Sequence, residues 1–257
     1  MTKLAFNILK LRRDTNLKSV EFFEQIESTN TAALNRLAVE TDLDNVLVLT
    51  ANQTAGRGRG NHRWHAGTGA LTFSLIRHFS NLSGNELATL GLATGIGTAE
   101  ALQEFTETPI RLKWPNDIYA EGKKLGGILI ETHPTASQTP VIGIGLNINN
   151  AIKQHAPREV ADASISLIDL IGTTSNLTDL LIVLLNRLDN FYMQLNAKRA
   201  DIPALWNPRC MLKGSEVDFV QGDIDYQGTC HGVQADGALL MEVSGEIRPF
   251  YSGSVNL

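Results

Sequence analysis

Residues 110–131 have the sequence IRLKWPNDIYAEGKKLGGILIE. The apolar residues from Ile110 to Trp114 predict a strand, and Pro115-Asn116-Asp117 interrupts it because proline and short polar residues favour a turn. A lysine, an asparagine and an aspartate thus meet at one strand end. The side-chain oxygens of the asparagine and the aspartate suit Mg²⁺, and the ammonium group of the lysine suits a phosphate. Taken alone, however, Pro-Asn-Asp is equally a simple turn signal.

The rest of this stretch predicts a hairpin. Ile118 to Ala120 and Lys124 to Glu131 form its two strands, and Glu121-Gly122 forms its turn. Further strands are expected at Glu21 to Ile26, Val46 to Thr50, Leu71 to Ile76 and Val141 to Ile148. Three helices are expected. The first follows the cap candidates Ser28, Thr29 and Asn30, and the second runs from Glu86 to Phe105 after a capping box formed by Ser83 and Glu86. The third runs from Thr178, its expected cap, to Gln194.

The pattern changes near residue 210. From Lys213 onward the chain shows short strand-like segments separated by glycines, which is typical of a small β-barrel. We therefore expect a domain boundary here, with one unit at residues 20–210 and a second at residues 211–257.

Composition excludes several classes of protein. The 257 residues carry 22 Lys+Arg and 27 Asp+Glu, a net charge of −5, and 43% of them are hydrophobic. This balance argues against a large basic surface for nucleic acid or anionic lipid, and against a disordered chain. The longest apolar run, Leu180 to Leu185, is too short to span a bilayer, and residues 1–13 do not resemble a signal peptide. Cys210 and Cys230 are too few for a metal cluster and are expected to be reduced thiols. We expect a cytoplasmic protein that binds neither membrane nor nucleic acid.

A glycine- and arginine-rich segment, Gly56-Arg57-Gly58-Arg59-Gly60, lies in an apolar-poor stretch from Gln53 to Gly69. Glycines let the backbone approach a ligand, and arginines supply fixed cations, so this loop suits a phosphate. It matches neither a P-loop nor a dinucleotide fingerprint. The alternatives are a solvated turn or a nucleic-acid arm.

Two strands carry unexpected small and polar residues. Lys124 is followed by Gly126-Gly127, and paired glycines in a strand indicate close approach of a ligand or of backbone. Gly143 and Gly145 precede Asn147 in an otherwise apolar strand. Asn147 offers a donor and an acceptor to a ligand, although a strand bulge with a satisfied asparagine explains it equally well.

Together these segments resemble the biotin–protein ligase family. The resemblance rests on Ser28-Thr29-Asn30, Gln53 to Arg59, Trp64, Lys113 to Asp117, Lys124 to Glu131 and Gly143 to Asn149, in this order, and it runs from about residue 20 to the C-terminus. It implies an α+β fold, in which a mixed β-sheet flanked by helices (the class II synthetase/biotin-lipoate ligase-like catalytic domain) precedes a small C-terminal SH3-like β-barrel.

The resemblance also implies an activity. Members of the family join biotin and ATP to give biotinyl-5′-AMP and pyrophosphate, with Mg²⁺, and then transfer biotin to one lysine of the biotin carboxyl carrier protein. Joining a carboxylate to a phosphate brings two anions together, so cations must offset their repulsion. Members often pair edge to edge through the central sheet, so a homodimer belongs to the same expectation.

Carried over position by position, the resemblance implies three sets of site residues, and it assigns no metal ligand. The biotin-binding set is Ser28, Thr29, Asn30, Gln53, Arg57, Gly58, Arg59, Lys124 and Gly127. The nucleotide-binding set is Arg59, Trp64, Lys113, Asn116 and Asn147. The catalytic set consists of the cations Lys124, Arg57, Arg59 and Lys113.

Two departures from the family pattern stand out. Gly60-Asn61-His62 occupies a stretch in which members usually carry further glycines and arginines. His62 in place of an arginine is expected to weaken adenylate retention, with Arg63 as a compensating charge. Bifunctional members also carry an N-terminal DNA-binding module, for which residues 1–20 are too short, so we expect no operator binding.

Two other functions compete with this interpretation. A lipoate or octanoate ligase or transferase shares the catalytic fold, but its signature loops differ. A non-catalytic biotin sensor or repressor would not need the lysines and arginines of the catalytic set.

Overall fold

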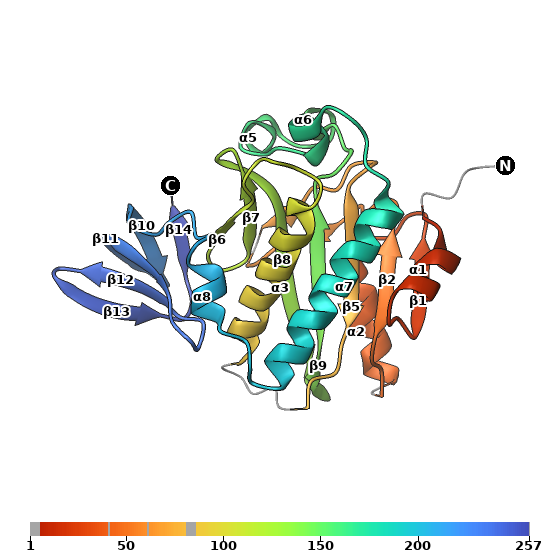
Figure 1. Ribbon diagram of the computed structural model, residues 1–257, viewed down its shortest axis with the longest axis horizontal. Helices are drawn as coiled ribbons and strands as arrows, with labels where there is room; N and C mark the ends of the chain where they lie inside the picture. The colour runs from red at the N-terminus through yellow and green to blue at the C-terminus, as the bar shows by residue number, and fades with distance from the viewer. Residues whose placement is uncertain (1–5, 41, 61, 81–85, 257) are drawn as a thin grey trace.

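The computed structural model describes residues 6–40, 42–60, 62–80 and 86–256. Its larger part is a seven-stranded mixed sheet in the order β1-β2-β5-β9-β8-β7-β6 (Figure 1). β1 and β2 are parallel and all other neighbours are antiparallel. The strands are β1 (Ser19–Phe23), β2 (Val46–Thr50), β5 (Leu71–Ile76), β6 (Arg111–Lys113), β7 (Asp117–Ala120), β8 (Lys123–His133) and β9 (Ala136–Leu146).

Helices cover both faces of this sheet. α3 (Glu86–Gln103) and α7 (Leu177–Asn196) pack together on one face, and α2 (Thr29–Val39) lies on the other. Shorter helices are α1 (Ile8–Asp14), α4 (Ile152–His155), α5 (Arg158–Asp162), α6 (Leu167–Ile171) and α8 (Ile202–Trp206).

The alternation of side chains along the strands decides which face each residue meets. Leu47, Leu49, Phe73 and Leu75 belong to the core under α3 and α7. Their neighbours in sequence, such as Val46 and Val48, pack with Ala33 and Leu37 of α2. Thr72 and Ser74 therefore also face the α2 side, which is where the functional site lies.

A second sheet follows the first in sequence. Its five antiparallel strands run in the order β13-β12-β11-β10-β14 and form the small C-terminal SH3-like unit (Figure 1). They are β10 (Glu216–Gln221), β11 (Ile224–Val233), β12 (Leu239–Val243), β13 (Glu246–Phe250) and β14 (Ser254–Asn256). The mixed sheet, the flanking helices and this second sheet confirm the predicted fold class. The boundary between residues 210 and 211 stays a prediction.

Most predicted elements are confirmed, and some bounds shift. The strands at 46–50 and 71–76 and the hairpin turn at Glu121-Gly122 are confirmed, with both turn residues at positive φ. The first strand is β1, Ser19–Phe23, and not Glu21 to Ile26, because its pairing partner β2 ends opposite Phe23. The predicted capping box at Ser83 lies outside the described residues.

The predicted cap of α7 is wrong. Asn176 is the N-cap, and its side chain accepts from the backbone N–H groups of Thr178 and Asp179. The Thr178 hydroxyl instead accepts a hydrogen bond from the backbone N–H of Asn7, which ties α1 to the start of α7. Asn7 precedes all strands of the large sheet in sequence and Thr178 follows them, so no local sequence pattern predicts this contact.

Both cysteines, Cys210 and Cys230, are buried and free. Within the described part of the chain, no helix is long and apolar enough to cross a membrane.

Candidate active site

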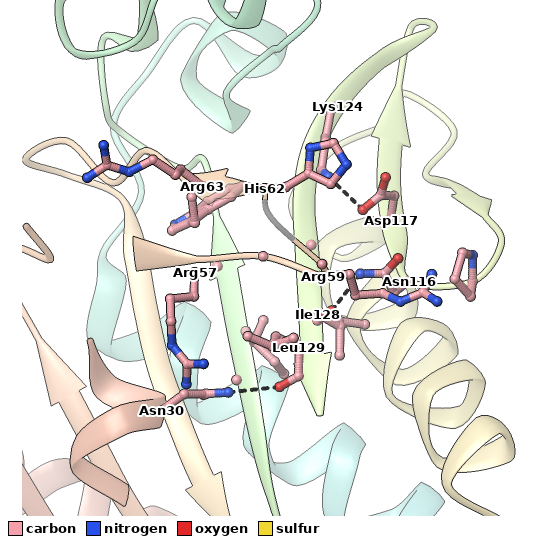
Figure 2. A pocket seen from close by; sticks show the side chains of 18 of the residues that line it. Asn30, Arg57, Arg59, His62, Arg63, Asn116, Asp117, Lys124, Ile128 and Leu129 are labelled. Carbon is pink, nitrogen blue, oxygen red and sulfur yellow. Dashed lines mark hydrogen bonds and ion pairs between the residues drawn. The ribbon is translucent and has the colours of Figure 1, made fainter. Parts of the chain in front are cut away.

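A cavity of about 750 Å³ lies on the α2 side of the large sheet (Figure 2). Twelve of the thirteen predicted site residues line it, namely Ser28, Thr29, Asn30, Gln53, Arg57, Gly58, Arg59, Trp64, Lys113, Asn116, Lys124 and Gly127. Asn147 does not. Its side chain is buried and its Oδ1 accepts from Asn150 Nδ2 at 3.0 Å.

The floor of the cavity is one row of residues that face each other across four strands. Thr72 of β5 pairs with Gly145 of β9, Gly145 pairs with Gly127 of β8, and Gly127 pairs with Asp117 of β7. Directly paired residues point to the same face of a sheet. The row therefore gives the cavity a floor of small or polar residues.

The glycines of β9 are required by what lies above them. A Cβ on Gly145 would overlap the Trp64 indole, and a Cβ on Gly143 would overlap the Asn30 amide. Trp64 comes from β4 (Arg63–Trp64), which pairs with β3 (Gly56–Arg57) in the glycine- and arginine-rich loop. The room that Gly143 and Gly145 leave is therefore filled by protein side chains. The close approach predicted at the paired glycines is confirmed at Gly126, where a Cβ would overlap the backbone oxygen of Gly145.

At one end of the cavity, uncharged polar side chains form a hydrogen-bonded network. Gln53 Oε1 accepts from the backbone N–H and the hydroxyl of Thr29, at 2.9 and 3.2 Å. Ser74 Oγ donates to Asn30 Oδ1 at 2.5 Å and lies 2.7 Å from Thr29 Oγ1. Ser28 holds the start of α2, because its hydroxyl accepts from the N–H of Thr31. This network fixes the side chains at the start of α2 before any ligand binds.

Glu131 connects the glycine-rich loop to this network. Its carboxylate accepts two hydrogen bonds from Arg57, at 2.9 and 2.6 Å, and one from Asn30 Nδ2 at 2.9 Å. Asn30 also donates to the carbonyl of Leu129 (Figure 2). Glu131 was not predicted as a site residue, although it is the last residue of the Lys124 to Glu131 segment that contributes to the family resemblance.

The opposite end of the cavity is cationic. Lys124 Nζ lies 2.6 Å from Asp117 Oδ1, and Lys113 lies over the Tyr119 ring at 5.8 Å from its centroid. Burial lowers the pKa of Lys113, although Asp117 opposes this effect. Burial also lowers the pKa of Arg59 and raises the pKa of Tyr119 to about 12, so Tyr119 is neutral near pH 7.

Asp117 is the only carboxylate among the described residues that line the cavity. Next to it, Asn116 donates through Nδ2 to the carbonyl of Ile128 at 2.7 Å (Figure 2), which leaves its amide oxygen available. Mg²⁺ in nucleotide sites is commonly held by one or two carboxylates together with phosphate oxygens. Asp117 and Asn116 fit this requirement.

The C-terminal sheet closes the cavity on one side. Val220, Gly222, Gly253, Ser254 and Val255 line it, and Arg59 Nη1 lies 3.5 Å from the carbonyl oxygen of Gly253. The glycine-rich loop thus contacts both sheets.

Figure 2 shows His62, the residue that stands in place of an arginine of the family pattern, and its neighbour Arg63. In Figure 2 the His62 ring points toward Lys124 and Asp117, whereas the Arg63 side chain points away from them. Arg63 nevertheless lines the cavity, so its role as a compensating charge stays a prediction.

Sequence reasoning missed Thr72 and Ser74 as well as Glu131. Thr72 and Ser74 lie on β5, whose sequence LTFSLI alternates a polar residue with an apolar one. That alternation was a signal for a polar cavity on one face, but it is equally typical of a half-exposed strand.

Comparisons with known proteins agree with this geometry. The sequence profile of the Biotin/lipoate A/B protein ligase family matches residues 22–149. The biotin--[acetyl-CoA-carboxylase] ligase of Mycobacterium tuberculosis is 30% identical over 243 residues, which cover 93% of this chain and 88% of that protein. The bifunctional ligase/repressor BirA of Escherichia coli is also 30% identical, over 93% of this chain and 74% of its own length.

A solved structure shares the architecture. The biotin protein ligase of Aquifex aeolicus in complex with biotin and ATP matches with a TM-score of 0.80 and 27% identity, over 93% of this chain and 98% of that one. The chain belongs to the biotin/lipoate A/B protein ligase family.

Proposed function

We propose that this protein is a biotin–[biotin carboxyl carrier protein] ligase, which activates biotin with ATP and transfers it to a lysine of the carrier. One observation carries the proposal: a single cavity has an uncharged polar end around Thr29 and Gln53 and a cationic end around Lys113 and Lys124. A neutral polar ring suits the first end, and a carboxylate beside a triphosphate suits the second. The names of the relatives support the same substrates.

In the first step, a biotin carboxylate oxygen attacks the α-phosphorus of ATP, the bond to the bridging oxygen breaks, and pyrophosphate leaves. Two anions approach one another, so Lys124, Lys113 and Arg59 stabilise the negative charge that accumulates. Asp117 and Asn116 would hold Mg²⁺, which neutralises charge on the triphosphate. The protein mainly positions the reactants.

In the second step, the neutral amine of the acceptor lysine attacks the acyl carbon, AMP leaves with the electrons of the broken C–O bond, and the nitrogen loses one proton to water to give the amide. The glycine-rich loop limits the access of water to the mixed anhydride, because Trp64 of its strand β4 lies over Gly145 in the floor of the cavity. We assign this catalysis to the unit of residues 20–210, and residues 211–257 form the SH3-like unit. The use of ATP as a substrate fits a cytoplasmic location.

The test is ATP–pyrophosphate exchange with biotin, lipoate and octanoate offered in turn, followed by transfer to a purified carrier domain. Exchange with biotin and labelling of one carrier lysine are expected. Exchange only with lipoate or octanoate would replace the proposal by a lipoate or octanoate ligase, and binding of biotin with no exchange would favour a sensor.

Two expectations about partners stay predictions. A gel shift with operator DNA checks whether the chain binds nucleic acid, and sedimentation with and without biotinyl-5′-AMP checks for the homodimer.

A further inference from the structure

The two cysteines of the chain lie next to each other where the two sheets meet. Cys210 forms a parallel bridge with Leu112 of β6, the edge strand of the large sheet, and Cys230 lies on β11 of the second sheet. The two side chains hydrogen-bond each other. Both residues are buried, Cys210 with 7% and Cys230 with 1% of its surface exposed. The proposed reaction uses neither thiol, so the pair lies outside the chemistry of the active site.

The backbone sets the positions of both cysteines. The N–H and the carbonyl of Leu112 hydrogen-bond the residues on either side of Cys210, at 2.9 and 3.0 Å. On β11 a bulge lies between Cys230 and Gly232, and such a bulge re-aims a side chain. The N–H of Gly232 donates to Cys230 Sγ at 3.4 Å. Ordered backbone on both sides therefore brings the two thiols together.

Several donors converge on the sulfur of Cys210. They are the backbone N–H groups of Leu212 and Lys213, the indole N–H of Trp206 and the thiol of Cys230. The Trp206 indole N–H is buried, and it has no other hydrogen-bond partner among the residues that the structure describes. A buried donor of this kind calls for an explanation. A neutral thiol is a weak acceptor and a thiolate is a strong one, so these donors together suit a thiolate at Cys210.

The two thiols differ in their charge state. The hydrogen bond with Cys230 lowers the pKa of Cys210 to about 6, although burial opposes this effect. The same hydrogen bond and burial raise the pKa of Cys230, and the positive charge of Lys213 offsets only part of that rise. At neutral pH the pair therefore consists of one thiolate and one thiol, and thiolates are the reactive form of cysteine.

We propose that Cys210 is a modification site, at which a peroxide oxidises the thiolate and Cys230 then converts the product to a disulfide. The Cys210 sulfur attacks one oxygen of hydrogen peroxide, the O–O bond breaks and hydroxide leaves, which gives a sulfenic acid. The Cys230 sulfur attacks the Cys210 sulfur, the S–O bond breaks, and the hydroxide leaves with the thiol proton as water. The two sulfur atoms are oxidised and the peroxide is reduced to water.

The modification would tie together the two sheets that line the cavity. Leu112, which is bridged to Cys210, directly precedes Lys113, and Lys113 lines the cavity together with Val220 of the second sheet. A disulfide from Cys230 would thus fix the second sheet to the edge strand that carries Lys113. Peroxide would set how freely these two parts of the protein move against each other.

The test is oxidation of the folded, ligand-free protein by hydrogen peroxide, followed by blocking of free thiols and mass spectrometry. We expect wild-type protein to lose two hydrogen atoms and to yield a single cross-linked peptide pair, and dithiothreitol should reverse the change. The chain has two cysteines, so an intramolecular disulfide joins Cys210 to Cys230. The oxidised protein should melt several degrees above the reduced protein, because the bond restricts the unfolded chain.

Single variants separate the roles of the two cysteines. Cys230→Ser keeps a hydroxyl that can donate to Cys210, so its oxidation should stop at a sulfenic acid, which dimedone traps. Cys210→Ser leaves Cys230 as a buried neutral thiol, and its oxidation should be at least about tenfold slower. Equal oxidation rates of the two variants would contradict the assigned roles.

The pH profile of the oxidation rate tests the donors. Since peroxide reacts with the thiolate, the rate in wild-type protein should reach half of its maximum at a pH of about 6. Trp206→Phe removes the indole N–H and keeps an aromatic ring, so this midpoint should rise. Trp114→Phe is the matched control, because Trp114 Nε1 donates to the carbonyl of Gly237 at 3.1 Å and not to a thiol. Its midpoint should stay in place, and the Tm of both variants checks that they fold.

Three results would overturn the inference. The first is folded wild-type protein that keeps both thiols at a peroxide concentration that oxidises the unfolded chain. The second is a wild-type midpoint of about 8.5, as for an ordinary cysteine. The third is the same midpoint in Trp206→Phe as in Trp114→Phe. None of these measurements uses biotin or ATP, so they are independent of the proposed function.

Discussion

Arg57 and Glu131 form a bidentate ion pair that joins the glycine-rich loop to strand β8. Guanidinium Nη1 and Nη2 donate to carboxylate Oε1 and Oε2, and Oε2 also accepts from Asn30. The loop is therefore held over the cavity in the ligand-free protein by the same carboxylate that orients a side chain at the start of α2. An arginine of the biotin-binding set is thus prepositioned by a residue outside that set.

The first prediction concerns this ion pair. Glu131→Gln removes the charge that holds Arg57, so the loop should open more often. Because Arg57 is partly exposed, with 43% of its side chain accessible, the pair contributes modestly. We expect amide hydrogen exchange in peptides that cover Gly56 to Arg59 to become about threefold faster without ligand. Glu24→Gln, an exposed change of equal charge, should leave this rate unaltered, and equal rates in both variants would contradict the role of Glu131.

The second prediction concerns the floor of the cavity. In Gly145→Ala the new Cβ would overlap the rigid indole of Trp64, so the ring must move from its place over β9. We expect a loss of about 1–3 kcal/mol in the free energy of unfolding and at least a tenfold weaker binding of biotinyl-5′-AMP. Thermal denaturation and calorimetry measure the two effects.

The control for this substitution is Gly91→Ala in α3. There the nearest atom to the new Cβ is Ile130 Cδ1 at 3.9 Å, an ordinary contact. Because alanine is the better helix former, this variant should gain up to about 1 kcal/mol. If both variants changed stability in the same direction, the close approach of Trp64 would not explain Gly145.

The sequence predicted those parts of the fold that have a local signal. The strand at Val46 to Thr50 is a short apolar run, and the Glu121-Gly122 turn contains the residues that a tight hairpin needs. Register is different, because it depends on which strands pair. No local pattern predicts that Thr72 and Gly145 pair with each other, because they are more than seventy residues apart in sequence.

The candidate site shows the same division. Motif resemblance found the residues that line the cavity, because motifs record side chains that meet a ligand. Glu131 and Ser74 act by holding other side chains, at sequence separations of 74 residues from Arg57 and 44 from Asn30. Such partners can be recognised only after the sheet brings β5 and β8 beneath α2. Asn147 is the opposite case. It is a polar residue in a predicted strand and was predicted to bind a ligand, but its side-chain oxygen accepts a hydrogen bond from its neighbour Asn150.

The third prediction separates two adjacent lysines. Lys124 lines the cavity and pairs with Asp117, whereas Lys123 is exposed. Lys124→Gln removes a cation from the point where the carboxylate and the α-phosphate meet. Loss of one such group costs about 10²–10³ in rate, so exchange kinetics should show a decrease of this size. Lys123→Gln should retain wild-type kcat and Tm. Equal effects of the two substitutions would mean that Lys124 acts only through net charge.

The last prediction concerns pH and Lys113. Burial lowers the pKa of this lysine from its ordinary value of 10.5, so the neutral amine forms at a lower pH than in an exposed lysine. The neutral amine cannot stabilise phosphate charge, and kcat/KM for ATP, which reports on the free enzyme, should therefore fall on the alkaline side with an apparent pKa below 10.5. Lys113→Arg keeps its charge at these pH values, because guanidinium is protonated throughout the range. It should retain part of the activity and move the alkaline limb to higher pH, whereas Lys113→Met should lose activity at every pH. An alkaline limb that stays in place in Lys113→Arg would assign it to another group and remove Lys113 from the set of cations that contact the phosphates.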